Sequence, residues 1–428
     1  MKCSDKKYEA YVQILKEELV PAMGCTEPIA IAYGAAVAKK YLEAIPDRVV
    51  IEASGNLIKN VKSVIVPNTC GMKGMPAAAA AGIIAGNPDR LLEVIADVKP
   101  EQKDEIKDYI EKHDIEVKLA GSKLTFDLTI TEYKDKSYVK VRIVNYHTNI
   151  VEIEKDGKIL YHEDIKGDSE VKLTDRSLLN IEDIVDFANT VDLKDVKEVI
   201  GRQIEYNSAI AEEGIKNNYG ANIGKIMLKT YGNDIKIRAK AMAAAGSDAR
   251  MNGCELPVVI VSGSGNQGMT ASLPVIEFAK ELKVSEEKLY RALVVSNLAT
   301  IHQKTGIGRL SAFCGAVSAG CGSGAGICYL NGGGYTEIAH TIVNALAIVS
   351  GMVCDGAKAS CAAKISSAVE AGILGYYMYK NGQEFKDGDG IISKGVENTI
   401  KNIGRLGHDG MKATDEEILH IMVGNRCV

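Results

Sequence analysis

Two patterns of hydrophobic and polar positions divide the chain. Short runs in which apolar and polar residues alternate predict half-buried strands in the first half, as in RVVIEAS (48–54), LTFDLTITEY (124–133) and YVKVRIVN (138–145). Helical spacing is found between and around them, at residues 6–20, 28–45 and 76–86. From about residue 180 onward, almost every segment has helical spacing. The pattern predicts an α+β fold in which an N-terminal mixed α/β domain packs against a C-terminal, mainly helical domain.

The domain boundary is expected near residue 190. Residues 1–190 would form the α+β domain, with a strand-rich region at 120–165, and residues 191–428 the helical domain. We expect GNLIKN (55–60) to be a turn between RVVIEAS and a further strand, VKSVIVP (61–67). Asp156 and Gly157 form the Asp-Gly pair that is typical of a hairpin turn.

Composition and charge then exclude several classes of protein. The chain has 428 residues, of which 46% are hydrophobic, and its 51 Lys and Arg nearly balance 56 Asp and Glu. No basic patch for nucleic acid or for a membrane surface is indicated. The N-terminal segment reads as a charged amphipathic helix, and no stretch of about eighteen uninterrupted apolar residues follows. We expect a cytoplasmic protein that acts on a small molecule, with neither nucleic acid nor membrane as partner.

The sequence contains ten cysteines, an unusual number for that compartment. We expect four of them, Cys3, Cys70, Cys254 and Cys427, to be structural, and the other six form a group: Cys25, Cys314, Cys321, Cys328, Cys354 and Cys361. A seven-residue spacing on a continuous helix separates two positions by roughly 10 Å, too far for one small cluster. DGAKAS (355–360) contains residues that break a helix, whereas the Gly-rich segment from 321 to 328 can stay helical. Cys354 and Cys361 are therefore the better pair of metal ligands.

The segment GSGNQG (263–268) has the glycine spacing of a dinucleotide-binding loop, after a strand-like run and before a helix. The expected second strand with its acidic residue is absent from the sequence that follows, because residues 284–297 read as another helix. We set nucleotide binding aside. The loop can still bind an anion such as a carboxylate, since backbone N–H groups at a helix N-terminus favour negative charge.

Six motifs together resemble the L-cysteine desulfidase family, which is related to the iron–sulfur L-serine dehydratases: GCTEP (24–28), HTNI (147–150), SDARM (247–251), GSGNQG, RLSAFC (309–314) and CDGAKASC (354–361). The similarity runs over essentially the whole chain. It implies a [4Fe–4S] cluster held by three cysteines, Cys314, Cys354 and Cys361, with one iron open for substrate and no pyridoxal phosphate. The implied reaction is β-elimination of L-cysteine to hydrogen sulfide, ammonia and pyruvate. The relatives' habits also imply a homodimer.

GCTEP stands where the dehydratases carry a motif that ends in Thr-x-Gly-Pro and supplies a histidine. The departure places the thiol of Cys25 where that histidine would lie, so Cys25 is either the catalytic base or a further cluster ligand. Cys25 also stands at a predicted helix N-terminus, which should lower the pKa of its thiol. We expect it to be the base.

Polar residues in otherwise apolar or Gly-rich segments are the candidates for binding substrate. They are Thr26, Asn56, His147, Asn149, Arg250, Asn266 and Gln267. Ordinary turn chemistry would also explain the Asn and Gln residues, and His147 could equally be a core residue. Arg250 could pair with Asp248 at a helix end instead of binding a carboxylate.

Three other functions remain open at this level. An enzyme of the same design could eliminate water from serine or threonine, because only the softness of sulfur favours cysteine. A non-catalytic iron–sulfur carrier or redox sensor would also use an exposed three-cysteine cluster. A pyridoxal phosphate lyase would need GSGNQG as a phosphate cup and a Schiff-base lysine, for which Lys358 and Lys364 are candidates.

Overall fold

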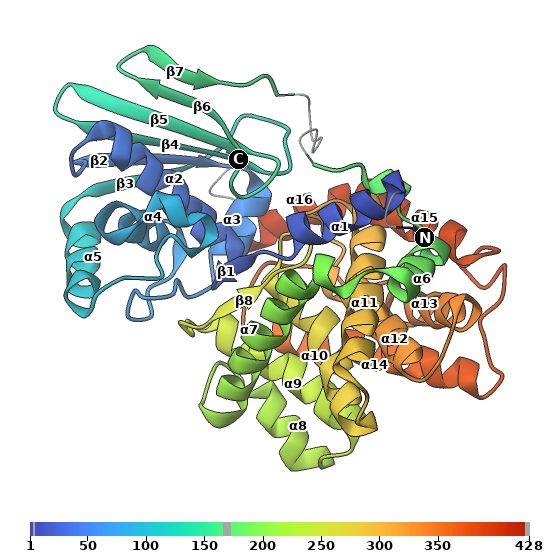
Figure 1. Cartoon of the computed structure of the whole chain (residues 1–428). Helices are drawn as coiled ribbons and strands as arrows, with labels where there is room; N and C mark the ends of the chain where they lie inside the picture. The colour runs from blue at the N-terminus through green and yellow to red at the C-terminus, as the bar shows by residue number, and fades with distance from the viewer. Residues whose placement is uncertain (3–4, 166–172, 424–428) are drawn as a thin grey trace.

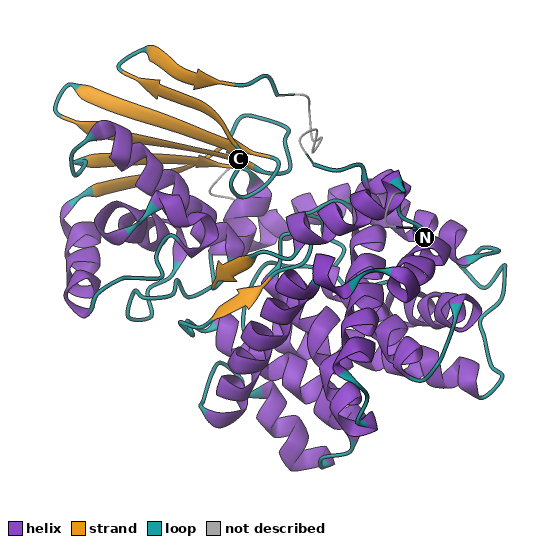
Figure 2. Cartoon of the chain, viewed as in Figure 1, coloured by secondary structure: helices purple, strands orange, loops and turns teal. Residues whose placement is uncertain are grey.

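The computed structural model describes residues 1–2, 5–165 and 173–423. It contains a six-stranded sheet with helices packed on it and a larger assembly of helices (Figures 1 and 2). The prediction of an α+β fold is confirmed. None of the helices in these ranges is both long and apolar enough to cross a membrane.

The sheet has the strand order β3-β2-β4-β5-β6-β7. Its strands are β2 (Arg48–Ala53), β3 (Asp114–Leu119), β4 (Asp127–Lys134), β5 (Ser137–Val144), β6 (Ile150–Lys155) and β7 (Lys158–His162). β2 and β3 run parallel and the other neighbours antiparallel. The predicted hairpin turn is confirmed between β6 and β7, where Asp156 and Gly157 have φ of 52° and 79°.

Three helices accompany the sheet: α2 (Thr26–Leu42), α4 (Gly74–Ala85) and α5 (Pro100–Lys112). Helix α2 packs on β4 and β5, and α4 packs on α2. The contact of α2 with the sheet is close at Gly34, because a Cβ at that position would lie 2.9 Å from Cδ1 of Ile130, which would have to shift. The glycine therefore brings the middle of α2 close to β4.

Two predicted elements of this part are wrong. GNLIKN is not a turn but the start of helix α3 (Gly55–Val61), in which Leu57 and Val61, four residues apart, are both fully buried. VKSVIVP is not a strand, since Ile65 forms only an isolated bridge with Lys73. Strand β3 is not among the predicted elements, although Ile115, Val117 and Leu119 alternate with polar residues; most of this strand is exposed in the fold.

The second half is helical, as predicted. Its helices are α6 (Ile181–Thr190), α7 (Lys197–Lys216), α8 (Ile223–Tyr231), α9 (Ile235–Met251), α10 (Gly265–Leu282), α11 (Glu286–Ile307), α12 (Gly315–Leu330), α13 (Tyr335–Val349), α14 (Cys361–Lys380) and α15 (Val396–Arg405). Helix α12 is buried along almost its entire length and contacts α10, α11, α13 and α14. Its contact with α14 depends on glycine, because a Cβ on Gly320 would lie 2.3 Å from the carbonyl oxygen of Ala368.

Helices near the two ends of the chain each pack against the part formed by the other half of the sequence (Figure 1). Helix α1 (Lys6–Glu18) packs with the helical part, where Tyr8 and Tyr11 each meet the ring of Phe187 edge-on at 5.3 Å. The next strand, β1 (Pro21–Met23), pairs antiparallel with β8 (Pro257–Val259). Helix α16 (Lys412–Val423), near the other end, packs against α3. Because β1 leads to Cys25 and β8 leads to GSGNQG, their pairing brings these two motifs together.

Candidate active site

One cavity collects most of the residues singled out from the sequence. Eight of the eleven predicted site residues line it: Cys25, His147, Arg250, Asn266, Gln267, Cys314, Cys354 and Cys361. They come from both parts of the molecule, His147 from the loop after β5 and Arg250 from the last turn of α9. The cavity is therefore formed where the sheet-containing part meets the helical part.

Four helix N-termini border this cavity. Cys25 is the N-cap of α2, Ser264 that of α10 and Cys314 that of α12, while Cys361 is the first residue of α14. None of these four helices has a side-chain hydrogen bond at its N-cap. Since the N-terminal N–H groups and the helix dipole favour negative charge, the cavity is suited to anions.

Three thiols, those of Cys314, Cys354 and Cys361, line the cavity near one another. The N–H of Cys314 donates to the carbonyl of Met352 (3.1 Å) and that of Cys354 to the carbonyl of Ala312 (2.6 Å). Residues 354–360 are not helical, so that Cys361 also lines the cavity, as the predicted helix break requires. Burial, and then the nearby thiols of Cys354 and Cys361, raise the pKa of Cys314 to about 12.

Two lysines lie near these thiols. Lys304 of α11 is 4% exposed and donates to the carbonyl of Gly308 (2.5 Å), and burial lowers its pKa to about 8. Lys364 of α14 also lines the cavity and forms an ion pair with Asp355.

In the described part of the chain, no three His, Cys, Asp or Glu side chains are placed to hold a single metal ion. Cluster thiolates each bind a different iron, and the three converging thiols beside two cations fit such a cluster.

The other cysteines lie elsewhere. Cys321 and Cys328 are fully buried in the continuous helix α12. Cys254 is buried and Cys70 is exposed. Cys3 and Cys427 lie outside the described residues.

Arg250 is a buried cation that lacks an anionic partner. It is 2% exposed, its Nη1 donates to Oδ1 of Asn266 (3.1 Å), and its Nε and Nη2 have no hydrogen-bond partner. Asp248 does not pair with it, because this carboxylate accepts from the N–H of Gly224 (3.1 Å) at the start of α8. Burial raises the pKa of Asp248 to about 6. Two guanidinium nitrogens, Nε and Nη2, therefore remain for a ligand.

Glycines make room for the polar side chains of the GSGNQG loop. A Cβ on Gly265 would lie 2.4 Å from Nε of Arg250, and one on Gly315 would lie 2.5 Å from Nε2 of Gln267. The strand before the loop, β8, pairs antiparallel with β1 in a two-stranded sheet. A dinucleotide-binding fold would place such a loop after a strand of a parallel sheet.

Cys25 is buried beside a carboxylate. Its Sγ donates to Oε2 of Glu27 (3.1 Å), and the hydroxyl oxygen of Thr26 lies 3.1 Å from the same carboxylate oxygen. Asn60 of α3 donates to Oε1 of Glu27 (3.1 Å). Burial, and then the charge of Glu27, raise the pKa of the Cys25 thiol well above its usual value. The predicted lowering of this pKa is wrong, because desolvation of the thiolate outweighs the helix N-terminus.

His147 is 5% exposed, and its ring meets that of Phe126 edge-on at 5.0 Å. Its Nε2 is buried without a hydrogen-bond partner. Burial lowers the pKa of His147 to about 4, against the opposing effect of Glu27. The imidazole is therefore neutral near pH 7 and can accept a hydrogen bond or a proton.

Three predicted residues do not line the cavity. The hydroxyl of Thr26 donates to the carbonyl of Gly263 (2.8 Å), which ties the start of α2 to the GSGNQG loop. Asn149 donates to the carbonyl of Val144 (3.0 Å) within its own turn. Asn56 is half-buried in α3, and its Oδ1 has no partner.

Sequence reasoning missed several cavity residues, among them Glu27, Asn60, Lys304 and Arg309. Glu27 stands within the GCTEP motif, but an acidic residue in the first turn of a helix is ordinary capping chemistry. Lys304 lies in a long helix with no distinctive pattern around it. Arg309 forms an ion pair with Glu18 of α1 (2.9 Å), a contact between residues far apart in sequence.

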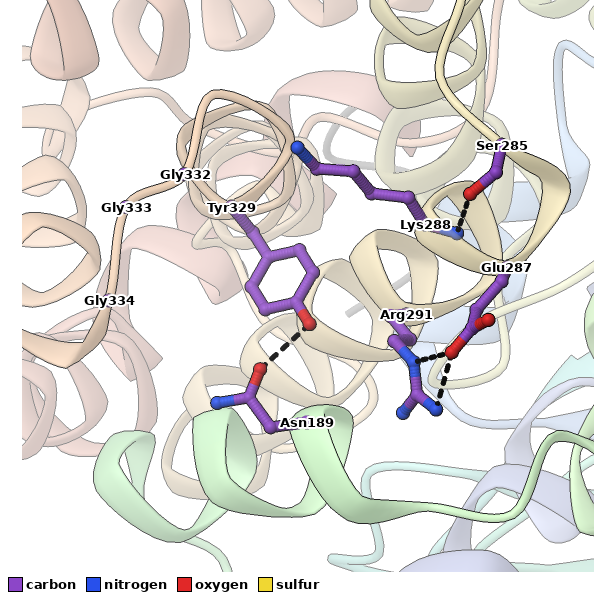
Figure 3. A pocket seen from close by; sticks show the side chains of 9 residues that line it. All are labelled: Asn189, Ser285, Glu287, Lys288, Arg291, Tyr329, Gly332, Gly333 and Gly334. Atoms are coloured by element: carbon purple, nitrogen blue, oxygen red, sulfur yellow. Dashed lines mark hydrogen bonds and ion pairs between the residues drawn. The ribbon is translucent and has the colours of Figure 1, made fainter.

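A second hollow lies on the helical part, around Ser285 at the start of α11 and Gly332–Gly334 (Figure 3). Its side chains are largely paired with one another. The hydroxyl of Tyr329 donates to Oδ1 of Asn189 (2.8 Å), and Arg291 pairs with Glu287 (2.9 Å). None of the predicted site residues lies there.

Comparisons with known proteins match this chain over most of its length. The chain is 66% identical to a UPF0597 protein of Desulfitobacterium hafniense over 430 residues, which cover 100% of this chain and 99% of the relative. UPF0597 proteins of Lachnoclostridium phytofermentans and Treponema denticola are 51% and 49% identical, over 97% and 99% of this chain and 100% of each relative. The model of the serine dehydratase alpha chain family matches residues 89–420, which include Arg250 and the three cavity thiols. The chain therefore belongs to the iron–sulfur serine dehydratase alpha chain family, which indicates an enzyme of the dehydratase or lyase kind.

Proposed function

We propose that the protein is an L-cysteine desulfidase, which eliminates sulfide from L-cysteine and leaves pyruvate and ammonia. The observation that supports it most is the convergence on one cavity of three thiols and a buried arginine with unpartnered N–H groups. The thiols provide for a cluster, and the arginine provides for a small carboxylate substrate. Membership of an iron–sulfur dehydratase family supports the same class of reaction.

Cys314, Cys354 and Cys361 are the proposed ligands of a [4Fe–4S] cluster. When bound, such a cluster with one open iron supplies a Lewis acid that withdraws electrons from the leaving sulfur. The N-termini of α12 and α14 and the side chain of Lys364 stabilise the ligand thiolates, since they place positive charge beside them. Pyridoxal phosphate has no role in this proposal.

Arg250 is the proposed site for the substrate carboxylate. Its Nε and Nη2 are buried and without partners, so a carboxylate that binds them restores the hydrogen bonds that burial has removed. Asn266 orients the guanidinium through Nη1. The backbone N–H groups in the first turn of α10 and the side chain of Gln267 add further donors at the same place.

Cys25 is the proposed base that removes the α-proton. Its thiol lies in the cavity at the start of α2, and the charge of Arg250 favours its thiolate, against burial and Glu27. His147 is a second candidate, because its imidazole is neutral and its Nε2 is unpartnered. Loss of the α-proton and of sulfide leaves aminoacrylate, which hydrolyses in water to pyruvate and ammonia.

Elimination of water from L-serine is the second candidate function, and the match to the serine dehydratase family favours it. The preference of soft metal sites for sulfur favours cysteine. Protein purified without oxygen should convert L-cysteine to sulfide, ammonia and pyruvate in equal amounts, faster than it converts L-serine to ammonia and pyruvate. Measurement of the three products with each substrate decides between them. Formation of alanine, or full activity of iron-free protein with pyridoxal phosphate, would contradict the proposal.

Sensitivity to oxygen, release of product and a dimeric state are further parts of this proposal. An open iron is accessible to oxygen, so activity should decay in air together with the iron content. A cluster carrier or redox sensor would retain the iron but release no pyruvate. A homodimer in the cytoplasm is expected, and the mass of the iron-loaded protein in solution would test the dimer.

A further inference from the structure

Two opposite charges are buried in the cavity without being paired. Glu27 and Arg250 are 7% and 2% exposed, and both line the cavity. Neither forms an ion pair with any of the described residues. Buried charges are costly unless each is paired, so both positions call for a ligand that carries the complementary charges.

Within the described ranges, the donors to the Glu27 carboxylate are all neutral. They are the thiol of Cys25 and the amide of Asn60, each at 3.1 Å, and the hydroxyl of Thr26, also at 3.1 Å, shares its one proton with the carbonyl of Gly263. Together they hold both carboxylate oxygens but supply no positive charge. A carboxylate held in this way still lacks a cation, and two oxygens can accept about four hydrogen bonds.

The partner of Arg250 is neutral too, since Nη1 meets the amide oxygen of Asn266. Both charges act on the same groups. Glu27 raises and Arg250 lowers the pKa of Cys25, and the same two residues have the same opposite effects on His147. Both residues line the same cavity, and Glu27 accepts from the thiol of Cys25 there, so a small molecule in this cavity faces the carboxylate and the guanidinium together.

The other charged side chains that the structure describes around the cavity are all positive, so only the position beside Glu27 favours a cation. Among the described residues that line it, Glu27 is the only carboxylate, whereas Arg250, Lys304, Arg309 and Lys364 are basic. A ligand ammonium would be repelled by these basic side chains and attracted only by Glu27.

We infer that Glu27 binds the α-ammonium of the substrate while Arg250 binds its carboxylate, so that the site accepts zwitterionic α-amino acids and rejects acids that lack the amino group. This inference rests on the proposed function and makes its substrate class specific. Glu27 contacts Cys25 directly, so an ammonium bound to Glu27 places the α-carbon close to the proposed base. The same contact explains why a carboxylate is built into the start of α2.

Three ligands test this assignment on the anaerobic, iron-loaded protein: L-cysteine, cysteamine, which lacks the carboxylate, and 3-mercaptopropionate, which lacks the ammonium. Their dissociation constants are measured by titration calorimetry. Glu27→Gln should weaken cysteine and cysteamine by about tenfold or more, the usual effect of losing a charged hydrogen bond, and change 3-mercaptopropionate less than about threefold. Arg250→Gln should show the reverse selectivity. Glu132→Gln, at a fully buried glutamate of β4 outside the cavity, should change none of the three.

Equal weakening of all three ligands by Glu27→Gln, or weakening of none, would overturn the assignment. If Glu27→Gln does not fold, the wild-type protein still decides: 3-mercaptopropionate that binds as tightly as cysteine excludes recognition of the ammonium. Failure of the proposed function would look different. A protein that binds the ligands with this selectivity but releases no sulfide from cysteine keeps the assignment and loses the desulfidase reaction.

Discussion

Cys314 and Cys354 are joined by their backbones, although 40 residues separate them in sequence. The N–H of Cys314 binds the carbonyl of Met352, and the N–H of Cys354 binds the carbonyl of Ala312, around an isolated bridge between Phe313 and Val353. This short antiparallel contact fixes the two thiols relative to each other before any cluster binds. Preorganisation of this kind reduces the entropy that ligand binding must overcome.

Replacement of each proposed ligand by alanine should abolish cluster retention. We expect Cys314→Ala, Cys354→Ala and Cys361→Ala to lose the iron, whereas Cys321→Ala and Cys328→Ala keep it, because the last two thiols are buried in α12 away from the cavity. Iron and acid-labile sulfide in the five variants provide the measurement. Loss of the cluster from Cys321→Ala together with its retention in Cys361→Ala would reverse the ligand assignment.

Cys25→Ser should keep the cluster and lose at least about a hundredfold in turnover, the usual contribution of an acid–base group. A serine hydroxyl is similar in shape to the thiol but is a much weaker acid, so it forms the anion that would act as the base far less readily. Iron content and the rate of pyruvate release separate the two roles. If the variant is isolated without iron, Cys25 is a cluster ligand, and a normal rate with a full cluster would leave His147 as the base.

The buried neutral His147 should make stability fall in acid. The pKa of His147 is about 4 in the folded state, below the usual 6.5. Between these two pH values the unfolded chain therefore binds more protons than the folded protein. The folded state loses stability as the pH falls from about 6.5 to 4. Between pH 6.5 and pH 5 the loss from this group is roughly 2 kcal/mol. We expect the unfolding temperature of the iron-free protein to drop less on acidification in His147→Gln than in wild type. Equal drops would show that His147 titrates normally.

Gly320→Ala should destabilise the protein, because α12 and α14 pack too closely at this position to leave room for a side chain. The added Cβ would lie 2.3 Å from the carbonyl oxygen of Ala368, so the helices must move apart, at a cost of about 1–3 kcal/mol. Cys314 and Cys361 stand at the N-termini of these helices, and the affinity for the cluster should fall as well. Gly121→Ala is the control, because no atom lies within 4 Å of its added Cβ and its φ is not positive. Unfolding temperature and iron content should be unchanged in the control.

The sequence by itself determined the features that depend only on residues close together along the chain. Alternation predicted β4 and β5, and the pair Asp156 and Gly157 predicted the hairpin between β6 and β7. The helix break in DGAKAS separated Cys354 and Cys361 from Cys321 and Cys328 as candidate ligands, and the structure has α14 beginning only at Cys361. These features follow from rise per residue, φ preference and period, which the local sequence fixes.

Only the tertiary structure decided which polar groups share the cavity and in which state they lie there. The pairing of β1 with β8 brings Cys25 to the GSGNQG loop, and the packing of α3 brings Asn60 to Glu27. Burial raises the pKa of Cys25, whereas the sequence predicted a lowered value. The packing also leaves two nitrogens of Arg250 without partners. The physical reason is that desolvation and charge pairing depend on everything that surrounds a group in space, whereas a helix N-terminus read from the sequence is only one of those contributions.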